Sequence, residues 1–209
     1  RLVGSEMCIR DRCLDSIFLE KPKELNFVRV LTQREDTETI RFLDKQTQHR
    51  SVKTIILNKM PTPGAARNIL INESKAEYIH FLDDDASLGP NYYQNALSRL
   101  RKTNCTVLGG PDRAALDANL FQKTFELILC HKFVMGETNK RHFKEENIIK
   151  MATEYDLTLC NLWVRRKLFN DKKFHFNETY KRCEENAFLK RAKQEGIQFL
   201  YDSNLYVYH

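Results

Sequence analysis

Three consecutive carboxylates, Asp83, Asp84 and Asp85, directly follow the apolar segment YIHFL at residues 78–82. An apolar run of this length that ends in a turn is typical of a buried strand, and open α/β sheets bind ligands at the carboxyl ends of their strands. Adjacent carboxylates repel each other unless a cation neutralises them, and hard divalent cations take oxygen ligands and bridge to phosphates. The cluster therefore predicts Mn²⁺ or Mg²⁺ bound together with a diphosphate. A solvated acidic turn that caps the next helix is the alternative.

Strand-like and helix-like segments alternate on both sides of this cluster. Strands are predicted at residues 25–32, 51–57, 77–82, 105–110, the start of 156–169, and 197–209. Helices are predicted at residues 13–18 (the tail of a helix), 37–46, 65–75, 91–102, 118–134, the end of 156–169, and 185–196. Strands that alternate with helices of about ten residues predict one α/β domain around a mostly parallel sheet.

Composition excludes several classes of protein. Of the 209 residues 42% are hydrophobic, which is enough for a buried core. No apolar run approaches the roughly 18 residues of a membrane span, and the seven glycines form neither GxGxxG nor GxxxxGK[ST], the dinucleotide-binding and P-loop motifs. The six cysteines include no CxxC pair, so we expect a reduced, cytoplasmic protein. The net charge of +6 suits an anionic partner.

The segment PGAARNILINESKAEYIHFLDDDASLGP, residues 63–90, resembles the donor-site segment of family-2 inverting glycosyltransferases with the GT-A fold. The matching residues are Gly64, Ala66, Arg67, Asn68, Asp83, Asp85 and Pro90. Four further stretches follow in the order of the family: GGP (109–111), CNLWVRR (160–166), CEENAFLKRAKQEG (183–196) and VYH (207–209). The resemblance implies a GT-A sheet flanked by helices, a nucleotide-sugar donor, and a glycan or lipid-linked glycan acceptor, with no nucleic-acid partner.

The resemblance also implies roles for individual residues. Asp85 and Asp83, with His209, would hold the metal ion, and Glu185 would be the general base, with Glu184 as the second candidate. The nucleotide sugar would contact Arg67, Asn68, Asp83, Asp84, Thr32 and Gln33, and the acceptor would contact Asn161 and Trp163. The structural alternatives are a solvated start of the helix for the Glu pair and a place in the core for Trp163.

This sequence departs from the family pattern at several positions. Thr32 and Gln33 stand where the family has paired Asp residues, so the donor nucleotide stays open, and Glu185 replaces the usual Asp. Residues 137–150 form a basic loop, in which Lys140, Arg141, His142 and Lys144 either close over the diphosphate or are solvated; the solvated loop is the favoured interpretation.

The N-terminal stretch RLVGSEMCIRDR, residues 1–12, resembles a translated sequencing adapter. We expect it to be a non-native leader without regular structure, with residues 13–209 forming a single GT-A-like domain that lacks the family's first strand.

These observations predict a metal-dependent inverting glycosyltransferase that acts in bacterial cell-surface polysaccharide or glycolipid synthesis. We expect it in the cytoplasm, at the inner face of the cell membrane if it associates with one. A sugar nucleotidyltransferase is the first alternative, because that class also uses strand-end carboxylates and Mg²⁺. A fragment that binds nucleotide without catalysing transfer is the second.

Overall fold

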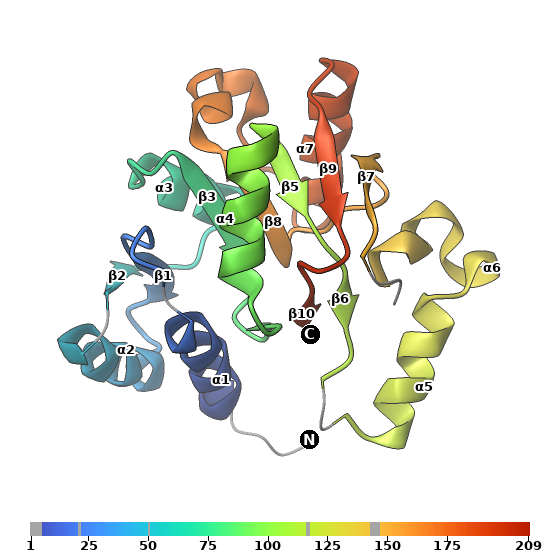
Figure 1. Ribbon diagram of the computed structural model, residues 1–209. Coiled ribbons are helices and arrows are strands. Elements are labelled where there is room, and N and C mark those ends of the chain that lie inside the picture. The colour runs from blue at the N-terminus through green and yellow to red at the C-terminus, as the bar shows by residue number, and fades with distance from the viewer. Residues whose placement is uncertain (1–5, 21, 50, 116–117, 143–146) are drawn as a thin grey trace.

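The computed structural model describes residues 6–20, 22–49, 51–115, 118–142 and 147–209, which form an α/β fold (Figure 1). The helices are α1 (Glu6–Leu19), α2 (Thr37–His49), α3 (Pro63–Asn72), α4 (Tyr92–Thr103), α5 (Leu120–Leu129), α6 (Lys132–Met135) and α7 (Glu184–Gln194), with 3₁₀ segments η1 (Gly136–His142), η2 (Arg166–Asn170) and η3 (Lys172–Phe174). The strands are β1 (Val28–Gln33), β2 (Val52–Leu57), β3 (Tyr78–Leu82), β4 (Ser87–Leu88), β5 (Val107–Gly109), β6 (Asp112–Arg113), β7 (Ile149–Ala152), β8 (Asn161–Arg165), β9 (Phe199–Asp202) and β10 (Val207–Tyr208).

The strands of the described residues form three hydrogen-bonded sets. The largest has the order β3-β8-β5-β9-β7, the second has the order β4-β10-β6, and β1 pairs in parallel with β2. The large sheet is mixed rather than mostly parallel, because β8 runs antiparallel to both of its neighbours and β7 runs antiparallel to β9. The chain reaches β8 from β7, at the far edge of the sheet, through the non-helical stretch 153–160.

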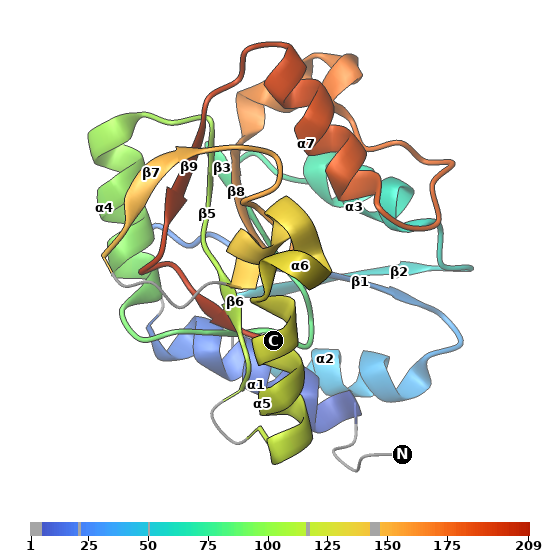
Figure 2. The same cartoon turned by 90° about the vertical axis from the view of Figure 1, so that its right-hand side faces the viewer.

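Helices cover both faces of the large sheet and give a three-layer arrangement. Figure 2 shows α4 on one side of this sheet and α3 and α7 on the other. The first core lies between α1, α2, α4 and the sheet and includes Leu14, Leu43 and Tyr92. The second core lies beneath α3 and α7 and includes Phe176 and Phe188. The sheet is therefore buried on both faces, as expected for this class of fold.

Four predicted elements differ from the structure. The helix predicted at residues 118–134 is interrupted at His131, whose backbone is extended (φ −87°, ψ 122°), so it forms α5 and α6. Strand β8 continues into the 3₁₀ segment η2 rather than into an α-helix, and residues 197–209 form two short strands. Helix α1 begins at Glu6, so part of the segment expected to lack regular structure is helical, while residues 1–5 lie outside the described residues.

A deep cleft separates the β1–β2 pair from the large sheet. It has a volume of about 1300 Å³ and is lined along its length by residues of both β1 and β3. Within the described part of the chain, β1 hydrogen-bonds as a strand only to β2, and β3 only to β8. The strand edges that face the cleft therefore have no ladder partner among those residues.

Candidate active site

The predicted metal residues come together at the carboxyl end of β3. Asp83 and Asp85 lie in the turn that follows this strand, and the N–H of Ala86 donates to the carbonyl of Asp83 at 3.1 Å. Strand β4 follows at once and pairs antiparallel with β10, which places the C-terminal His209 beside the turn. His209 Nε2 lies 3.2 Å from Asp85 Oδ1, and one ligand atom from each of the three residues falls within 4.8 Å of the others.

The charges at this cluster shift the pKa values of its members. Burial raises the pKa of Asp83, although the positive charges of His209 and Arg67 oppose that rise. A hydrogen bond from His209 lowers the pKa of Asp85. Hydrogen bonds to Asp112 and Asp85 raise the pKa of His209 above its ordinary value. Two carboxylates and one imidazole from separate segments form a donor set that fits Mn²⁺ or Mg²⁺.

The residues expected at the nucleotide lie along the polar end of the cleft. Its lining includes Thr32, Gln33, Arg67, Asp83 and Asp84. Thr32 is buried and Gln33 half-buried at the end of β1, whereas Asp84 is exposed. The structure therefore brings together five of the six residues predicted for nucleotide-sugar binding.

Arg67 connects this end of the cleft to the start of α7. Its guanidinium forms an ion pair with Glu184, the first residue of α7, whose side chain is only 4% exposed. The same guanidinium lies 5.8 Å from the centre of the Phe176 ring. The positive charge of Arg67 also opposes the rise in the pKa of Asp83. The Arg67 side chain therefore interacts electrostatically with both the carboxylate cluster and the predicted catalytic helix.

Asn68, the sixth predicted nucleotide residue, is engaged elsewhere. Its side-chain amide donates to the carbonyl of Phe176 and to Glu178 Oε1, each at 2.9 Å, and its Oδ1 accepts from the N–H of Phe176 at 3.0 Å. A Cβ on Gly64, one helical turn earlier, would lie 2.3 Å from the carbonyl oxygen of Asn177. Gly64 and Asn68 thus hold α3 against residues 176–178, and this structural role explains their place in the motif.

Glu185 lies half-buried in the first turn of α7, next to Glu184. Arg141 of η1 lies near Glu185: its guanidinium interacts electrostatically with the Glu185 carboxylate and donates a hydrogen bond to Asn186 Oδ1 at 2.8 Å. Cys183, which precedes the helix, has a left-handed backbone (φ 60°). Of the two glutamates, Glu184 is buried in an ion pair with Arg67, and Glu185 is the more accessible to solvent.

Both residues predicted to contact the acceptor make contacts inside the domain. The side chain of Asn161 is fully buried; its amide donates to the carbonyl of Leu205 at 2.5 Å, and its Oδ1 accepts from the Tyr92 hydroxyl. Trp163 stacks on His80 at 4.5 Å and donates to the Tyr92 hydroxyl at 3.1 Å. Asn161 is therefore a core residue, whereas Trp163, although only 6% exposed, also lines the cleft, and the acceptor role of both residues stays a prediction.

Three residues near the cluster were absent from the predicted set of site residues. The first is Asp112 on β6, whose Oδ2 lies 3.8 Å from His209 Nδ1. The Oδ1 of Asp112 contacts Nδ1 of His142, the second of these residues. Cys160 lies 4.0 Å from Asp112 Oδ2, and burial raises the pKa of its thiol. Asp112 directly follows the GGP motif, and Cys160 is the first residue of CNLWVRR. These two motifs could therefore have indicated both residues from the sequence. In the basic loop, Lys140 pairs with Glu137 in an exposed ion pair, and Lys144 lies outside the described residues.

A mixed α/β sheet with a carboxylate cluster at a strand end is the arrangement of GT-A glycosyltransferases, whose solved structures share this fold. The sequence comparison gives the family: residues 11–172 match the model of glycosyl transferase family 2, and the chain belongs to this family. No curated protein sequence matches the chain significantly.

Solved structures of glycosyltransferases share the fold at low sequence identity. TarS 1–349 of S. aureus in complex with UDP-GlcNAc superposes with a TM-score of 0.73 at 17% identity, over 96% of this chain and 54% of that one. GalNAc-T7 with UDP, GalNAc and Mn²⁺ superposes with a TM-score of 0.67 at 13% sequence identity, over 97% of this chain and 41% of that one. The mannosyltransferase PcManGT of Pyrobaculum calidifontis with GDP-Man and Mn²⁺ superposes with a TM-score of 0.66 at 11% sequence identity, over 99% of this chain and 54% of that one. The chain spans about half the length of these proteins or less.

Among the described residues, no helix has the length and apolar character needed to cross a bilayer.

Proposed function

We propose that this chain carries the donor site and general base of a metal-dependent inverting glycosyltransferase. The observation that supports this most directly is the convergence of Asp83, Asp85 and His209, of which Asp83 also lines the polar end of the cleft. Arg67 ties this cluster to the helix that begins with Glu184 and Glu185. A donor site beside a carboxylate base is the arrangement that sugar transfer from a nucleoside diphosphate requires.

In this proposal Asp83, Asp85 and His209 hold Mn²⁺ or Mg²⁺, which supplies charge to stabilise the departing nucleoside diphosphate. Arg67 adds a fixed positive charge beside the same phosphates. Glu185 accepts the proton of the acceptor hydroxyl as its oxygen forms a bond to the anomeric carbon. The bond from that carbon to the diphosphate oxygen breaks on the opposite face, so the configuration inverts.

Glu185 is preferred to Glu184 as the base because of their contacts. Glu184 is buried and already paired with Arg67, so its carboxylate is not available to an acceptor hydroxyl. Glu185 is half-buried, so an incoming hydroxyl can reach it. A base must lie within hydrogen-bond reach of the proton that it removes.

The donor is a nucleotide sugar, and the acceptor a hydroxyl of a glycan or lipid-linked glycan. UDP-GlcNAc, UDP with GalNAc, and GDP-Man are bound in the related structures, two of which also contain Mn²⁺. Thr32 and Gln33 offer neutral hydrogen-bonding groups where the family has carboxylates, so a nucleobase other than uracil fits the proposal equally. The family match gives no support to the alternative of a sugar nucleotidyltransferase.

The cellular setting that we propose is cell-surface polysaccharide assembly in a bacterium, at the inner face of its membrane. Support comes from the α5–α6 apolar surface, a set of exposed residues: Leu120, Phe121, Phe125, Leu127, Ile128, Phe133 and Val134. Exposed Lys123 and Lys132 lie among them. Apolar and basic side chains on one short helical segment are typical of binding at the surface of an anionic bilayer.

Titration calorimetry with UDP and GDP, with and without Mn²⁺, tests the proposed function. We expect Mn²⁺ to raise the affinity for one nucleotide and Asp85→Ala to abolish this increase. Asp44→Ala, which removes an exposed carboxylate of α2, is the matched control and should behave as wild type. Nucleotide affinity that is equal with Mn²⁺ and with EDTA would exclude the metal role. Binding without sugar transfer to any acceptor would favour the non-catalytic alternative.

A further inference from the structure

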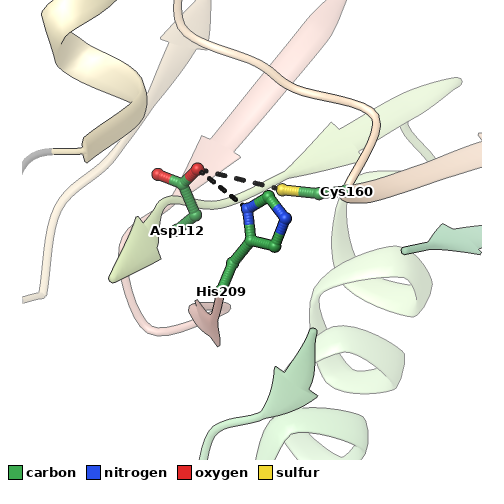
Figure 3. A group of neighbouring side chains, drawn as sticks. All are labelled: Asp112, Cys160 and His209. Carbon is green, nitrogen blue, oxygen red and sulfur yellow. Dashed lines mark hydrogen bonds and ion pairs between the residues drawn. The ribbon is translucent and has the colours of Figure 1, made fainter. Parts of the chain in front are cut away.

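Three side chains from distant segments converge beside the predicted donor site. Asp112 lies on β6, Cys160 directly precedes β8, and His209 follows β10. The three side chains point toward one another (Figure 3). Asp112 Oδ2 is 4.0 Å from Cys160 Sγ and 3.8 Å from His209 Nδ1, and one ligand atom from each residue lies within 4.8 Å of the other two.

The backbone holds these residues in place. Strands β6 and β10 pair in parallel, and the N–H of His209 donates to the carbonyl of Arg113 at 2.9 Å. Asn161, the neighbour of Cys160, donates through its side chain to the carbonyl of Leu205, in the turn before β10. Asp112 therefore lies on a strand, and Cys160 and His209 each directly adjoin a strand whose position these bonds fix.

The environment of the cluster resembles that of a metal site. Cys160 is buried, and the side chain of Asp112 is only 13% exposed. The second carboxylate oxygen of Asp112 contacts His142 Nδ1. An outer partner of this kind orients a ligating carboxylate and supports its charge, as is usual around protein-bound metals.

We propose that Asp112, Cys160 and His209 form a second cation site, selective for thiophilic divalent ions such as Zn²⁺. Thiolate, imidazole and carboxylate are the ligands that Zn²⁺ uses, and three protein ligands leave the fourth tetrahedral position for water. Mn²⁺ and Mg²⁺ prefer oxygen donors, which selects them for Asp83 and Asp85 instead. Binding of Zn²⁺ releases the Cys160 thiol proton to solvent.

His209 is shared between the two clusters, with a consequence that rests on the proposed function. Its Nε2 faces Asp85 and its Nδ1 faces Asp112. Neutral imidazole has one unprotonated nitrogen, so it can ligate one cation at a time. Zn²⁺ at Cys160 therefore withdraws His209 from the Mn²⁺ site, and it should weaken nucleotide binding that depends on Mn²⁺.

Cobalt(II), a spectroscopic substitute for Zn²⁺, tests the site in the full 209-residue chain. We expect Co²⁺ to give a thiolate-to-cobalt charge-transfer band that Zn²⁺ removes. Cys160→Ser should lose the band, while Cys105→Ser, which removes a half-buried thiol away from the cluster, should keep it. His142→Ala should weaken Zn²⁺ binding by about 10–100-fold. Circular dichroism of each variant confirms that it is folded.

Absence of the band in wild type, or its persistence in folded Cys160→Ser, overturns the site. Calorimetry with UDP and GDP in Mn²⁺ then tests the competition: added Zn²⁺ should lower affinity in wild type but not in Cys160→Ser. A cobalt band without this effect refutes the sharing of His209. Failure of Mn²⁺ to influence nucleotide binding refutes the proposed function instead, and the cobalt band still decides the site.

Discussion

Arg67 on α3 and Glu184 on α7, 117 positions apart in the chain, form an ion pair that joins the donor side of the molecule to its predicted catalytic helix. Glu184 is almost fully buried, whereas the Arg67 side chain is 21% exposed. Loss of one partner of a buried pair leaves an uncompensated charge, which is costly.

We therefore expect Arg67→Gln to lower the free energy of unfolding by up to about 3 kcal/mol, somewhat less than for a fully buried pair. The double variant Arg67→Gln/Glu184→Gln should recover part of this loss, because no charge is then left unpaired. Urea unfolding of the two single variants and the double variant gives the coupling energy. Strictly additive effects would mean that the ion pair does not stabilise the contact between α3 and α7.

Replacement of Glu185 separates binding from catalysis. Glu185→Gln keeps the shape of the side chain but cannot accept a proton, so turnover should fall by about 10²–10⁴-fold while nucleotide affinity stays unchanged. Glu195→Gln, at the other end of α7, is the control and should leave turnover intact. Turnover close to wild type in Glu185→Gln would move the role of base to another residue.

His80 gives the fold a specific pH dependence. It lies half-buried between the rings of Tyr92 and Trp163, and desolvation there lowers its pKa from 6.5 to about 3. Between these values the unfolded chain binds the proton and the folded chain does not, so stability falls as the pH falls. The slope due to this one residue is about 1.4 kcal/mol per pH unit.

His80→Gln should flatten this slope, because glutamine keeps a hydrogen-bonding group near the Tyr92 hydroxyl and does not titrate. Urea unfolding between about pH 7 and pH 4 measures the slope. His131→Gln, which changes an exposed imidazole, serves as the control. An identical slope in wild type and His80→Gln would show that His80 is not kept neutral by burial.

The α5–α6 apolar surface predicts binding to membranes. Burial of one large apolar side chain contributes about 1.5–3 kcal/mol, so Phe121→Ser/Phe125→Ser should reduce binding to vesicles that contain anionic lipid by well over tenfold. Met151→Ser, a change to an exposed apolar residue of β7, is the matched control. Vesicle flotation measures the bound fraction. If both variants and wild type stay unbound, this surface has another role.

The cleft between β1 and β3 predicts that the domain accepts a further strand, which we propose is supplied upstream of α1. Helices α1 and α2 lie on the same side of the β1–β2 pair (Figure 1), so strand–α1–β1 would repeat the arrangement of β1–α2–β2. An upstream extension of alternating Val and Thr should raise the melting temperature and reduce aggregation, because it pairs two free edges.

A Gly/Ser extension of equal length is the control for this experiment. It adds the same number of residues but little tendency to form a strand. If both extensions leave melting and light scattering as they are in the 209-residue chain, the cleft does not accept a strand.

Much of the donor site could be predicted from the sequence because its signals are local. The apolar strand before Asp83 and the helix predicted at residues 65–75 each rest on a short stretch of sequence, and the structure confirms both elements, although α3 begins earlier, at Pro63, and ends at Asn72. The place of His209 beside Asp85 rested on the family resemblance, and the pairing of β4 with β10 supplies its physical reason.

What the sequence could not indicate depends on pairing between distant segments. A motif gives the order of residues but not how deeply each side chain is buried, so the sequence did not indicate that Asn161 is fully buried and Trp163 only 6% exposed. Asp112 and Cys160 are 48 positions apart and meet because β5 pairs antiparallel with β8, which sets Gly109 opposite Leu162; His209 joins them through the pairing of β6 with β10. No local pattern marks such a meeting.

The cleft also bears on how the domain opens. The β1–β2 pair and α2 attach to the large sheet through side-chain packing, without a strand ladder among the described residues, so their amide protons should exchange at a lower free energy than those of β5 and β8. A nucleotide that touches Thr32 on one side and Asp83 on the other would tie the two parts together. Its binding would then be visible as slower hydrogen exchange in β1 and β2, although Asp83 lies far along the chain from both strands.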